Sequence, residues 1–369
     1  MVASTSIKGK RPSVVVLGGG YGGLTTAKAL DDIADVTLVD PSDAFLHNVA
    51  SWRALVQPDW VDRIFMPLNQ LLRHGRFLRD RAVEVEGRKV TLASGAELEP
   101  DYLVLATGSS YPFPAKAAEA DQHRAKAALQ GAHEALQKAQ RCLIVGAGPA
   151  GLELAGEIKH FMPEKTITVV DVSPDILSGP FDQALRDELK RQLDELGVRL
   201  VLGSPLRELP EAAPGSLAPV EVTTEAGETV TADIWFRAFG VRPATGYVRG
   251  ALANARDARG YLSVDERLQV KGVDGVYALG DISSADRDTA LAAGQQAEVL
   301  AANIRALITG EGEQLAYQPG PPLIAVPLGP QAGATQLPDG VTGAEATASI
   351  KGESMLIEMY SVHFNAQDR

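Results

Sequence analysis

Short apolar runs, glycine turns and helical patterns follow one another in a repeated order along the first half of the chain. The apolar run at residues 13–17 precedes a glycine-rich turn, and a helical pattern then extends to Leu30 before a second apolar run at residues 36–40. Residues 142–171 repeat this order, with the helix ending near His160. Strands that alternate with helices predict parallel sheets covered by helices, which is an α/β fold.

The pattern between and after these two units is more varied. Residues 83–98 alternate as in a small hairpin or meander, and residues 101–108 read as a buried strand ending in a turn. Further elements are predicted as helices at residues 115–140, 183–196 and 289–309, a hairpin at 220–232, and strands at 234–243 and 261–281. Glycine and proline then become frequent over residues 310–343, and we expect a last strand and helix to begin near Ala348.

The first glycine turn has the spacing Gly-x-Gly-x-x-Gly at a junction between a strand and a helix. In this pattern the first glycine permits a tight turn, the second lets the backbone approach a pyrophosphate, and the third allows close helix packing. The helix N-terminus offers free N–H groups to the phosphates, and Asp40 ends the next strand, where its carboxylate can accept ribose hydroxyls. A glycine-rich loop without a ligand is the alternative. The candidate contacts are Gly18, Gly20, Tyr21, Gly22, Gly23 and Asp40.

The second turn repeats this arrangement, and Asp171 at the end of its following strand bears on the choice of cofactor. A carboxylate there repels a 2′-phosphate, and Val172 and Ser173 follow it in place of an arginine. We therefore expect NADH, with NADPH as the alternative if a distant Lys or Arg compensates. The candidate contacts are Gly146, Gly148, Pro149, Ala150, Gly151, Asp171 and, at the end of a later strand, Gly240.

Two further segments indicate a flavin. Residues 276–281 resemble the motif in which a strand-end aspartate binds the ribityl chain of FAD, and residues 106–108 resemble its companion turn. Each is weak alone, but their order around the inserted second unit is the layout of the two-dinucleotide-domain flavoprotein reductases. The candidate flavin contacts are Val83, Ala106, Thr107, Gly108, Gly280 and Asp281.

These motifs predict two three-layer, Rossmann-like dinucleotide-binding domains, one inserted in the other, and a small α+β C-terminal domain. We expect FAD on the first domain and NADH on the second. The predicted boundaries are 1–111 and 241–312 for the FAD-binding domain, 112–240 for the NADH-binding domain and 313–369 for the C-terminal domain.

Composition and charge exclude several classes of function. A net charge of −12 disfavours binding to nucleic acid or to anionic lipid. The one cysteine, Cys142, permits no intramolecular disulfide, fits a reducing cytoplasm and is expected in the core, so the branches with redox cysteine pairs drop out. No run reaches the roughly 18 apolar residues of a membrane span, and Val2 does not fit N-myristoylation, so we expect at most peripheral membrane contact. No two histidines have metal-ligand spacing, and no metal site is predicted.

One stretch after the first unit carries a closer resemblance. Residues Phe45–Val56, FLHNVASWRALV, resemble the Phe-x-His-Asn-x-Ala-x-x-Arg-Ala stretch of the AIF-like family of FAD- and NAD(P)H-dependent oxidoreductases, which includes the ferroptosis suppressor proteins. Residues 106–109, 112–116 and 151–159 match further. The resemblance implies an NAD(P)H oxidase or an NAD(P)H:quinone reductase that uses FAD, with ubiquinone-like and vitamin-K-like quinones as acceptors.

The resemblance also implies roles for individual residues. Lys116 matches the lysine near flavin N5, and Glu153 matches the glutamate that contacts this lysine and orients the nicotinamide. A cation beside N5 would stabilise negative charge on the flavin. The alternative places Lys116 in a solvated loop and Glu153 on the surface of a helix.

Further candidate contacts come from the same stretch and from a later helix. His47, Asn48 and Arg53 are candidates for the flavin, although His47 and Asn48 could instead cap local backbone. Gln295 and Gln296 lie at a helix start that resembles the one bordering the quinone pocket in type II NADH dehydrogenases. They are candidates for contact with quinone or flavin, and an exposed pair of glutamines is the alternative.

The sequence therefore predicts an FAD-dependent, NADH-preferring oxidoreductase that passes electrons to a small-molecule acceptor of the quinone type, as a monomer or homodimer. Two rivals stay open. One is a reductase of a ferredoxin-like or rubredoxin-like carrier, which would need a basic docking face. The other is a redox-responsive signalling protein that forms a stable charge-transfer complex with NADH.

Overall fold

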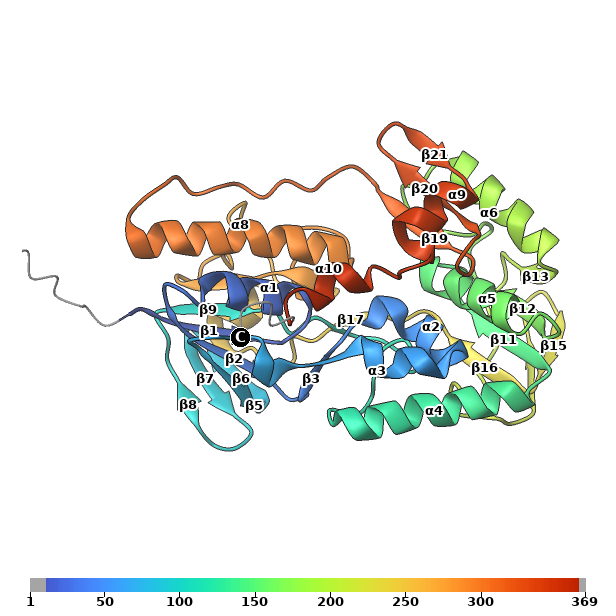
Figure 1. The fold of residues 1–369 in the computed structure, drawn as a ribbon, viewed down its shortest axis with the longest axis horizontal. Helices are drawn as coiled ribbons and strands as arrows, with labels where there is room; N and C mark the ends of the chain where they lie inside the picture. The colour runs from blue at the N-terminus through green and yellow to red at the C-terminus, as the bar shows by residue number, and fades with distance from the viewer. Residues whose placement is uncertain (1–10, 365–369) are drawn as a thin grey trace, which may run out of the picture. The chain divides into compact units, whose positions relative to one another are not determined.

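The computed structural model describes residues 11–364, which form two compact units. Unit 1 consists of the chain up to Ala44, Pro67–Ser109 and Arg242–Pro319. Unit 2 consists of Phe45–Met66, Ser110–Val241 and the chain from Gly320 onward. Each unit is thus assembled from segments that are far apart in sequence (Figure 1).

Unit 1 contains a five-stranded parallel sheet in the order β18-β9-β1-β2-β5. Its strands are β1 (Ser13–Leu17), β2 (Asp35–Asp40), β5 (Arg76–Arg79), β9 (Tyr102–Leu105) and β18 (Val276–Ala278). The central strands are almost continuous apolar runs, which is typical of parallel strands whose two faces are both covered.

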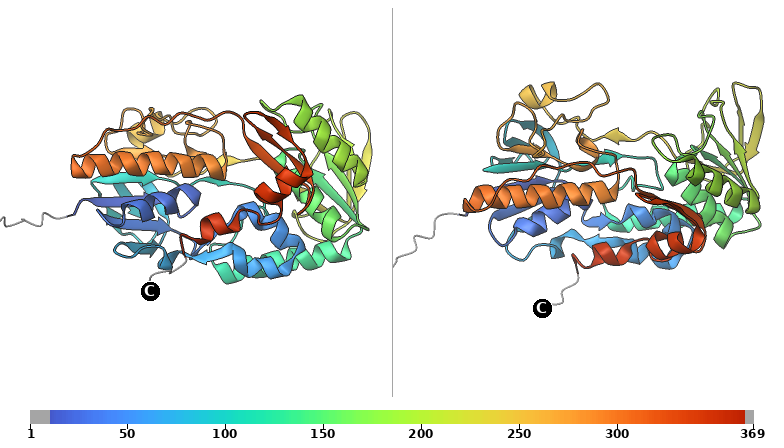
Figure 2. Two further views of the ribbon diagram at one scale, coloured as in Figure 1. Left: turned by 45° about the horizontal axis from the view of Figure 1, so that its top comes forward. Right: turned by 90° about the horizontal axis from the view of Figure 1, so that it is seen from above.

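Two helices of unit 1 pack against each other beside this sheet, α1 (Tyr21–Leu30) and α8 (Ala290–Thr309) (Figure 1 and Figure 2). Thr289 caps the start of α8 by accepting a hydrogen bond from the Ala292 amide, and Gly310 ends it in the left-handed conformation at φ 71°. The smaller elements of unit 1 are α7 (Gly250–Asn254) and an antiparallel sheet of β6 (Ala82–Glu86), β7 (Lys89–Leu92) and β8 (Glu97–Leu98).

Unit 2 contains a four-stranded parallel sheet in the order β13-β12-β11-β16. Its strands are β11 (Arg141–Val145), β12 (Thr166–Val170), β13 (Val198–Val201) and β16 (Ile234–Arg237). The associated helices are α4 (Gln122–Lys138), α5 (Pro149–Phe161) and α6 (Gln183–Glu195), and β14 (Val220–Thr223) and β15 (Thr229–Ala232) form a hairpin. The core lies between these helices and the sheet, where Ile144, Leu152 and Ile167 are fully buried.

The rest of unit 2 comes from Phe45–Met66 and from the chain after Gly320. The first of these segments forms α2 (Ser51–Val56) and α3 (Val61–Ile64). The C-terminal segment forms three strands, β19 (Ile324–Pro327), β20 (Gly333–Leu337) and β21 (Gly340–Thr342). They are followed by α9 (Ala344–Thr347), a π-helical turn (Ala348–Gly352) and α10 (Ile357–Ser361). A short sheet pairs β3 (Ala44–Leu46) with β4 (Phe65–Pro67). The strands β10 (Ser109–Ser110) and β17 (Arg242–Pro243) lie at the positions in the sequence where the chain passes from one unit to the other.

Several predicted elements differ from the structure. The strand predicted over residues 234–243 is divided into β16 and β17, and within residues 261–281 only Val276–Ala278 forms a regular strand. The helix expected from residue 115 begins only at Gln122, because Asp121 adopts extended backbone and accepts a hydrogen bond from the Arg124 amide as an N-cap. The strand expected near Ala348 is wrong, since the three C-terminal strands precede it and the chain is helical there. The glycines of that region serve close strand packing: a Cβ on Gly333, at φ 117°, would lie 2.3 Å from the Val326 carbonyl oxygen.

Candidate functional site

The first glycine turn connects β1 to α1 and is tightly enclosed on one side. Gly18 lies at φ 106°, and a Cβ added to it would lie 2.2 Å from the Ala106 carbonyl oxygen. A Cβ on Gly23 would lie 1.8 Å from the Gly18 carbonyl oxygen, so the helix packs directly on the turn. A Cβ on Gly20, by contrast, would have no described atom within 4 Å. The turn is therefore closed at its first and third glycines and open at the second, where a phosphate can approach the backbone.

Asp40 holds this turn from the end of β2. Its carboxylate accepts a hydrogen bond from the Gly19 amide at 2.6 Å and one from the Ser42 amide at 2.7 Å. Burial raises the pKa of Asp40, and these two hydrogen bonds oppose that shift. The Ser42 side chain donates a third hydrogen bond to this carboxylate. A carboxylate has about four lone-pair sites, so room remains for a ribose hydroxyl.

The second glycine turn, between β11 and α5, has the same geometry. A Cβ on Gly146, at φ 116°, would lie 2.6 Å from the Ala238 carbonyl oxygen, and one on Gly151 would lie 1.9 Å from the Gly146 carbonyl oxygen. A Cβ on Gly148 would again have no described atom within 4 Å. Asp171 accepts hydrogen bonds from the Ala147 amide at 2.6 Å and the Ser173 amide at 2.7 Å. Both units thus carry the shape and the donors that a dinucleotide pyrophosphate needs.

The start of α5 adds to this site because Pro149 occupies its first turn, a position where the missing N–H costs no helical hydrogen bond. Ala150 follows it and is half-buried. The free N–H groups and the partial positive charge of this helix end point to the side where Gly148 is open.

The two flavin-type segments lie side by side in unit 1, because β9 and β18 are neighbouring parallel strands. Asp281 accepts a hydrogen bond from the Ser109 hydroxyl at 2.6 Å. Thr107 donates to the Ala244 carbonyl at 2.9 Å and shares a 3.0 Å hydrogen bond with the Tyr247 hydroxyl. The structure therefore brings together the two motifs that are separated by the whole second unit in the sequence.

Gln296 supports the turn that carries Asp281. Its side-chain oxygen accepts hydrogen bonds from the Gly280 amide at 2.8 Å and the Ser283 hydroxyl at 3.2 Å, and the residue is 1% exposed. Gln295 beside it is exposed. Contact of either glutamine with a quinone or flavin stays a prediction.

Glu153 lies in the second turn of α5 and forms a buried ion pair that the sequence did not indicate. Lys351 Nζ lies 2.6 Å from its Oε1 atom, and both side chains are largely buried. Burial raises the pKa of Glu153, with Lys351 opposing the shift and Glu157 adding to it. Lys351 is the only lysine after Lys271, which is the one sequence signal that could have drawn attention to it.

A second buried ion pair lies one turn further along α5. Arg53 donates two hydrogen bonds to the Glu157 carboxylate, at 2.6 and 2.8 Å, and a third to the Gly352 carbonyl at 2.8 Å. The guanidinium also lies over the Trp60 and Phe161 rings. Both pairs therefore join α5 to the same C-terminal segment, and contact of Arg53 with a flavin stays a prediction.

His47 reaches this segment as well, so it does not act as a local backbone cap. Its Nε2–H donates to the Met355 carbonyl at 2.7 Å, 308 residues away in the sequence. Burial lowers the pKa of His47 to about 4, which keeps the ring neutral at pH 7. The ring lies among Phe45 and Tyr360.

The remaining predicted contacts are placed on defined elements, and their roles stay predictions. Lys116 is half-buried in the loop before α4, Tyr21 is the first residue of α1, and Asn48 starts a 3₁₀ turn. Val83 is 42% exposed on β6. Gly240 lies at φ 95° in the loop after β16.

Cys142 is a core residue, as predicted. It lies on β11 with 2% exposure, and burial raises the pKa of its thiol to about 12. A thiol that stays protonated at neutral pH is a poor nucleophile. With no second cysteine in the chain, dithiol chemistry within the protein is excluded.

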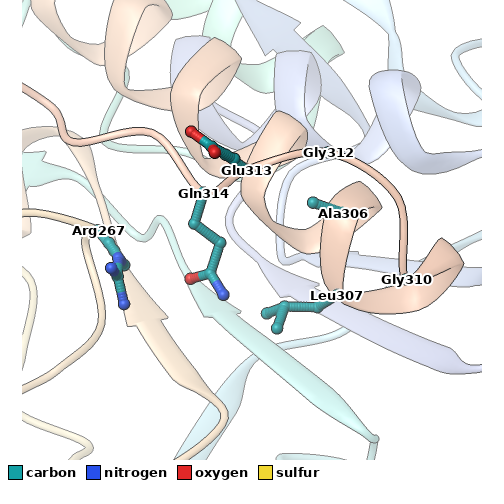
Figure 3. Close-up of a pocket in the computed structure, with 7 residues that line it drawn as sticks. All are labelled: Arg267, Ala306, Leu307, Gly310, Gly312, Glu313 and Gln314. Atoms are coloured by element: carbon teal, nitrogen blue, oxygen red, sulfur yellow. The ribbon is translucent and has the colours of Figure 1, made fainter.

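A shallow cavity of about 400 Å³ lies in unit 1 beside the end of α8 and is lined by Arg267, Leu307 and Glu313 among others (Figure 3). The start of the same 20-residue helix packs on the first glycine turn, where Gly22 faces Ala293. The two ends of such a helix are about 30 Å apart, so this cavity is separate from the dinucleotide site.

Residues 11–364 contain neither a metal-binding cluster nor a membrane-spanning helix. No group of three or more His, Cys, Asp or Glu side chains there could hold a metal ion. Within the same residues, every helix is too short or too polar to cross a bilayer.

Two dinucleotide turns with acidic strand ends, each on a parallel sheet, and a flavin-type pair of strands define the class of two-dinucleotide-domain flavoprotein oxidoreductases. The family model for pyridine nucleotide-disulphide oxidoreductases matches residues 12–297. The chain belongs to this family, and within it to the AIF-like proteins.

Two curated relatives match almost the whole chain. Apoptosis-inducing factor homolog B of Dictyostelium discoideum is 30% identical and covers 96% of this chain and 97% of its own length. Ferroptosis suppressor protein 1 of Mus musculus is 30% identical and covers 93% of each. The predicted resemblance is thereby confirmed.

Solved structures confirm the predicted fold class. NDH2 of Plasmodium falciparum in complex with NADH has a TM-score of 0.77 at 14% identity and covers 96% of this chain and 97% of its own. The sulfide:quinone oxidoreductase of Aquifex aeolicus has a TM-score of 0.75 at 18% identity, covering 96% and 91%. The protein is an NAD(P)H-dependent flavoprotein oxidoreductase that uses FAD, as the sequence predicted.

Proposed function

We propose that this protein is an NADH-preferring oxidoreductase that delivers electrons to a quinone-type acceptor. FAD is assigned to the turn of unit 1 and NADH to the turn of unit 2. Bound FAD supplies the redox chemistry by accepting hydride from the nicotinamide and passing electrons on. The chain supplies binding, orientation and charge, and the observation that carries the proposal is the duplicated turn geometry with an acid at each strand end.

The preference for NADH rests on Asp171. Its carboxylate lies at the edge of the second turn, where it is held by the Ala147 and Ser173 amides. A 2′-phosphate beside it would meet like charge, and the next side chain, Val172, is 64% exposed and offers no cation. We expect kcat/KM for NADH to exceed that for NADPH by about tenfold or more, which is about 1.4 kcal/mol. Equal kcat/KM values for NADH and NADPH would contradict the proposed role of Asp171 in cofactor selection.

Charge at the reacting end is assigned to Lys116, Glu153 and Lys351. The family resemblance implies that Lys116 lies near flavin N5, where its ammonium would stabilise negative charge on the ring. Lys351 neutralises the buried Glu153 carboxylate and fixes its direction. Glu153, two residues after the last glycine of the turn, can then accept a hydrogen bond from the nicotinamide carboxamide.

The choice of acceptor rests on the cysteine content, the family resemblance and the net charge of the chain. Cys142 is buried and single, so this chain lacks the thiol pair that disulfide chemistry requires. The AIF-like resemblance implies quinones, and one structural neighbour is named a sulfide:quinone oxidoreductase. The net charge of −12 disfavours docking of an acidic carrier such as ferredoxin. The single buried thiol supports a reducing compartment, and we propose the cytoplasm.

An acceptor screen with NADH tests this function. Ubiquinone and menaquinone analogues, ferricyanide, oxygen and ferredoxin are compared in steady state, and flavin reduction and reoxidation are followed by anaerobic stopped flow. We expect prompt reoxidation by quinone and slow or no reoxidation by ferredoxin. A reduced complex that stays stable to both quinones and oxygen would instead favour a redox-sensing role.

A further inference from the structure

Arg237 is the last residue of β16 and stands beside the second glycine turn. In the parallel pairing of β11 with β16 it lies opposite Val145, the residue immediately before Gly146. The next residue, Ala238, packs directly under the turn, because a Cβ on Gly146 would lie 2.6 Å from its carbonyl oxygen. Arg237 is therefore at the carboxyl edge of the sheet, which is where parallel α/β sheets bind their ligands.

The Arg237 guanidinium has a buried donor without an acceptor. Within residues 11–364 its Nε atom is one of two buried side-chain atoms that have no hydrogen-bond partner. The group is held in place by packing, since its central carbon lies 4.5 Å from the centre of the Phe239 ring. A buried cationic donor that lacks an acceptor is costly, so its position is best explained by a ligand that supplies one.

The backbone after β16 is shaped around this guanidinium. Gly240 lies at φ 95°, and a Cβ there would lie 2.8 Å from Arg237 Nη2. A residue with a side chain at this position would be strained and would also push the guanidinium away. Gly240, predicted as a cofactor contact, thus has a direct physical connection to Arg237.

The strand order indicates which part of the dinucleotide reaches Arg237. Asp171 follows β12 on one side of the glycine turn, and Arg237 ends β16 on the other side. With the adenosine ribose at Asp171 and the pyrophosphate over the turn, the nicotinamide half extends towards β16. Tyr111 lies close enough to both Glu153 and Arg237 to be affected by their charges. Burial raises the pKa of Tyr111 to about 12, Glu153 adds to the shift and Arg237 opposes it.

We propose that Arg237 is a cofactor-binding residue that binds the nicotinamide-side phosphate of the dinucleotide through its guanidinium fork. A phosphate is the ligand group that matches a planar cation with parallel N–H donors. Glu153 is already neutralised by Lys351, so the Arg237 cation is free to serve an anion of the cofactor. This inference rests on the proposed placement of NADH on the Gly146 turn.

Direct binding to the oxidised holoenzyme tests the assignment without any electron acceptor. Isothermal titration compares ADP-ribose, which carries both phosphates, with AMP, which carries only the adenosine-side phosphate. For Arg237→Gln we expect ADP-ribose to bind about tenfold weaker or worse, and AMP to change by less than about twofold. Arg237→Lys keeps the positive charge but loses the planar pair of N–H donors. Its affinity for ADP-ribose should therefore lie between those of the wild type and Arg237→Gln.

Two further variants sharpen the comparison. Gly240→Ala should weaken the binding of ADP-ribose, as Arg237→Gln does, because the added methyl group displaces the guanidinium. Arg207→Gln removes one exposed arginine elsewhere in unit 2 and should leave the affinities for ADP-ribose and AMP unchanged. FAD content and thermal unfolding of each variant confirm that it is folded.

Three outcomes would overturn the inference. Unchanged ADP-ribose affinity in folded Arg237→Gln would show that Arg237 does not bind a phosphate. A rise in KM for NADH alone would then indicate a contact with the nicotinamide carboxamide, which ADP-ribose lacks. Equal weakening of AMP and ADP-ribose would reject the nicotinamide side. If folded Gly148→Val binds ADP-ribose as tightly as the wild type does, the placement of NADH on the second turn fails and this inference fails with it.

Discussion

Acid should weaken the attachment of the C-terminal segment to the rest of unit 2 through one side chain, His47. Its buried ring donates to the Met355 carbonyl and lies against Phe45 and Tyr360. Burial lowers its pKa from 6.5 to about 4, with Lys351 adding to the shift and Glu358 opposing it. The unfolded chain therefore takes up a proton at a higher pH than the folded protein. Stability is lost as the pH falls from about 6.5 towards 4 and is regained as it rises.

The size of the effect follows from the two pKa values. With 6.5 in the unfolded chain and about 4 in the folded protein, lowering the pH from 7 to 5 costs about 2 kcal/mol. This corresponds to roughly a 20-fold rise in the equilibrium constant for releasing the segment. Met355 and Leu356 both have left-handed backbone, at φ 50° and 60°, which is unfavourable for residues with side chains. Loss of the His47 hydrogen bond removes one interaction that holds this conformation.

His47→Gln is the test, because the glutamine amide can donate the same hydrogen bond but does not titrate. Hydrogen exchange of residues 355–364 and urea unfolding are measured at pH 7 and pH 5 for both proteins. The wild type should lose about 2 kcal/mol more than the variant over this range, while other titrating groups cancel in the difference. His123→Gln on the exposed face of α4 is the control and should behave like the wild type. Equal losses in wild type and His47→Gln would refute the reasoning.

Three further predictions concern the charged residues of unit 2. Lys116→Ala should keep its yellow FAD and slow flavin reduction by NADH by about tenfold or more in stopped flow; an unchanged rate would remove Lys116 from the reacting centre. Lys351→Met leaves the Glu153 carboxylate buried without its cation, so the unfolding free energy from urea titration should fall by about 3 kcal/mol, and a loss below about 0.5 kcal/mol would show that the pair is solvated. Arg53→Met should cost about 3–5 kcal/mol, and most of that loss should be recovered when its carboxylate partner is replaced by leucine as well; no recovery would argue that packing of the guanidinium dominates.

Local patterns predicted the parts of this fold that are local. The strand at residues 13–17, the turn after it and the acid at Asp40 all lie within one unit of supersecondary structure, and the structure has them as predicted. The same holds for the second turn and Asp171. In these segments the spacing of glycines and apolar residues is itself the physical cause of the structure.

The contacts of the C-terminal segment could not be predicted in this way. Lys351 pairs with a carboxylate 198 residues away, and His47 binds a carbonyl 308 residues away. A buried ion pair depends on which elements pack together, and no periodicity in the sequence reports that. In the sequence, the glycines of residues 310–343 indicate only a change of composition, whereas in the structure Gly333 permits two strands to approach closely. The unpartnered Arg237 is likewise visible only once its surroundings are known.

Redesign of the cofactor preference would meet a constraint in Asp171. One carboxylate oxygen accepts from the Ala147 amide and the other from the Ser173 amide, so the residue that would repel a 2′-phosphate also maintains the shape of the phosphate-binding turn. Replacing it to admit NADPH would release both amides and loosen the site for either nucleotide. The side chain of Val172 is 64% exposed and does not hold the turn. An engineered switch to NADPH would therefore do better to add an arginine at position 172 and leave the aspartate in place.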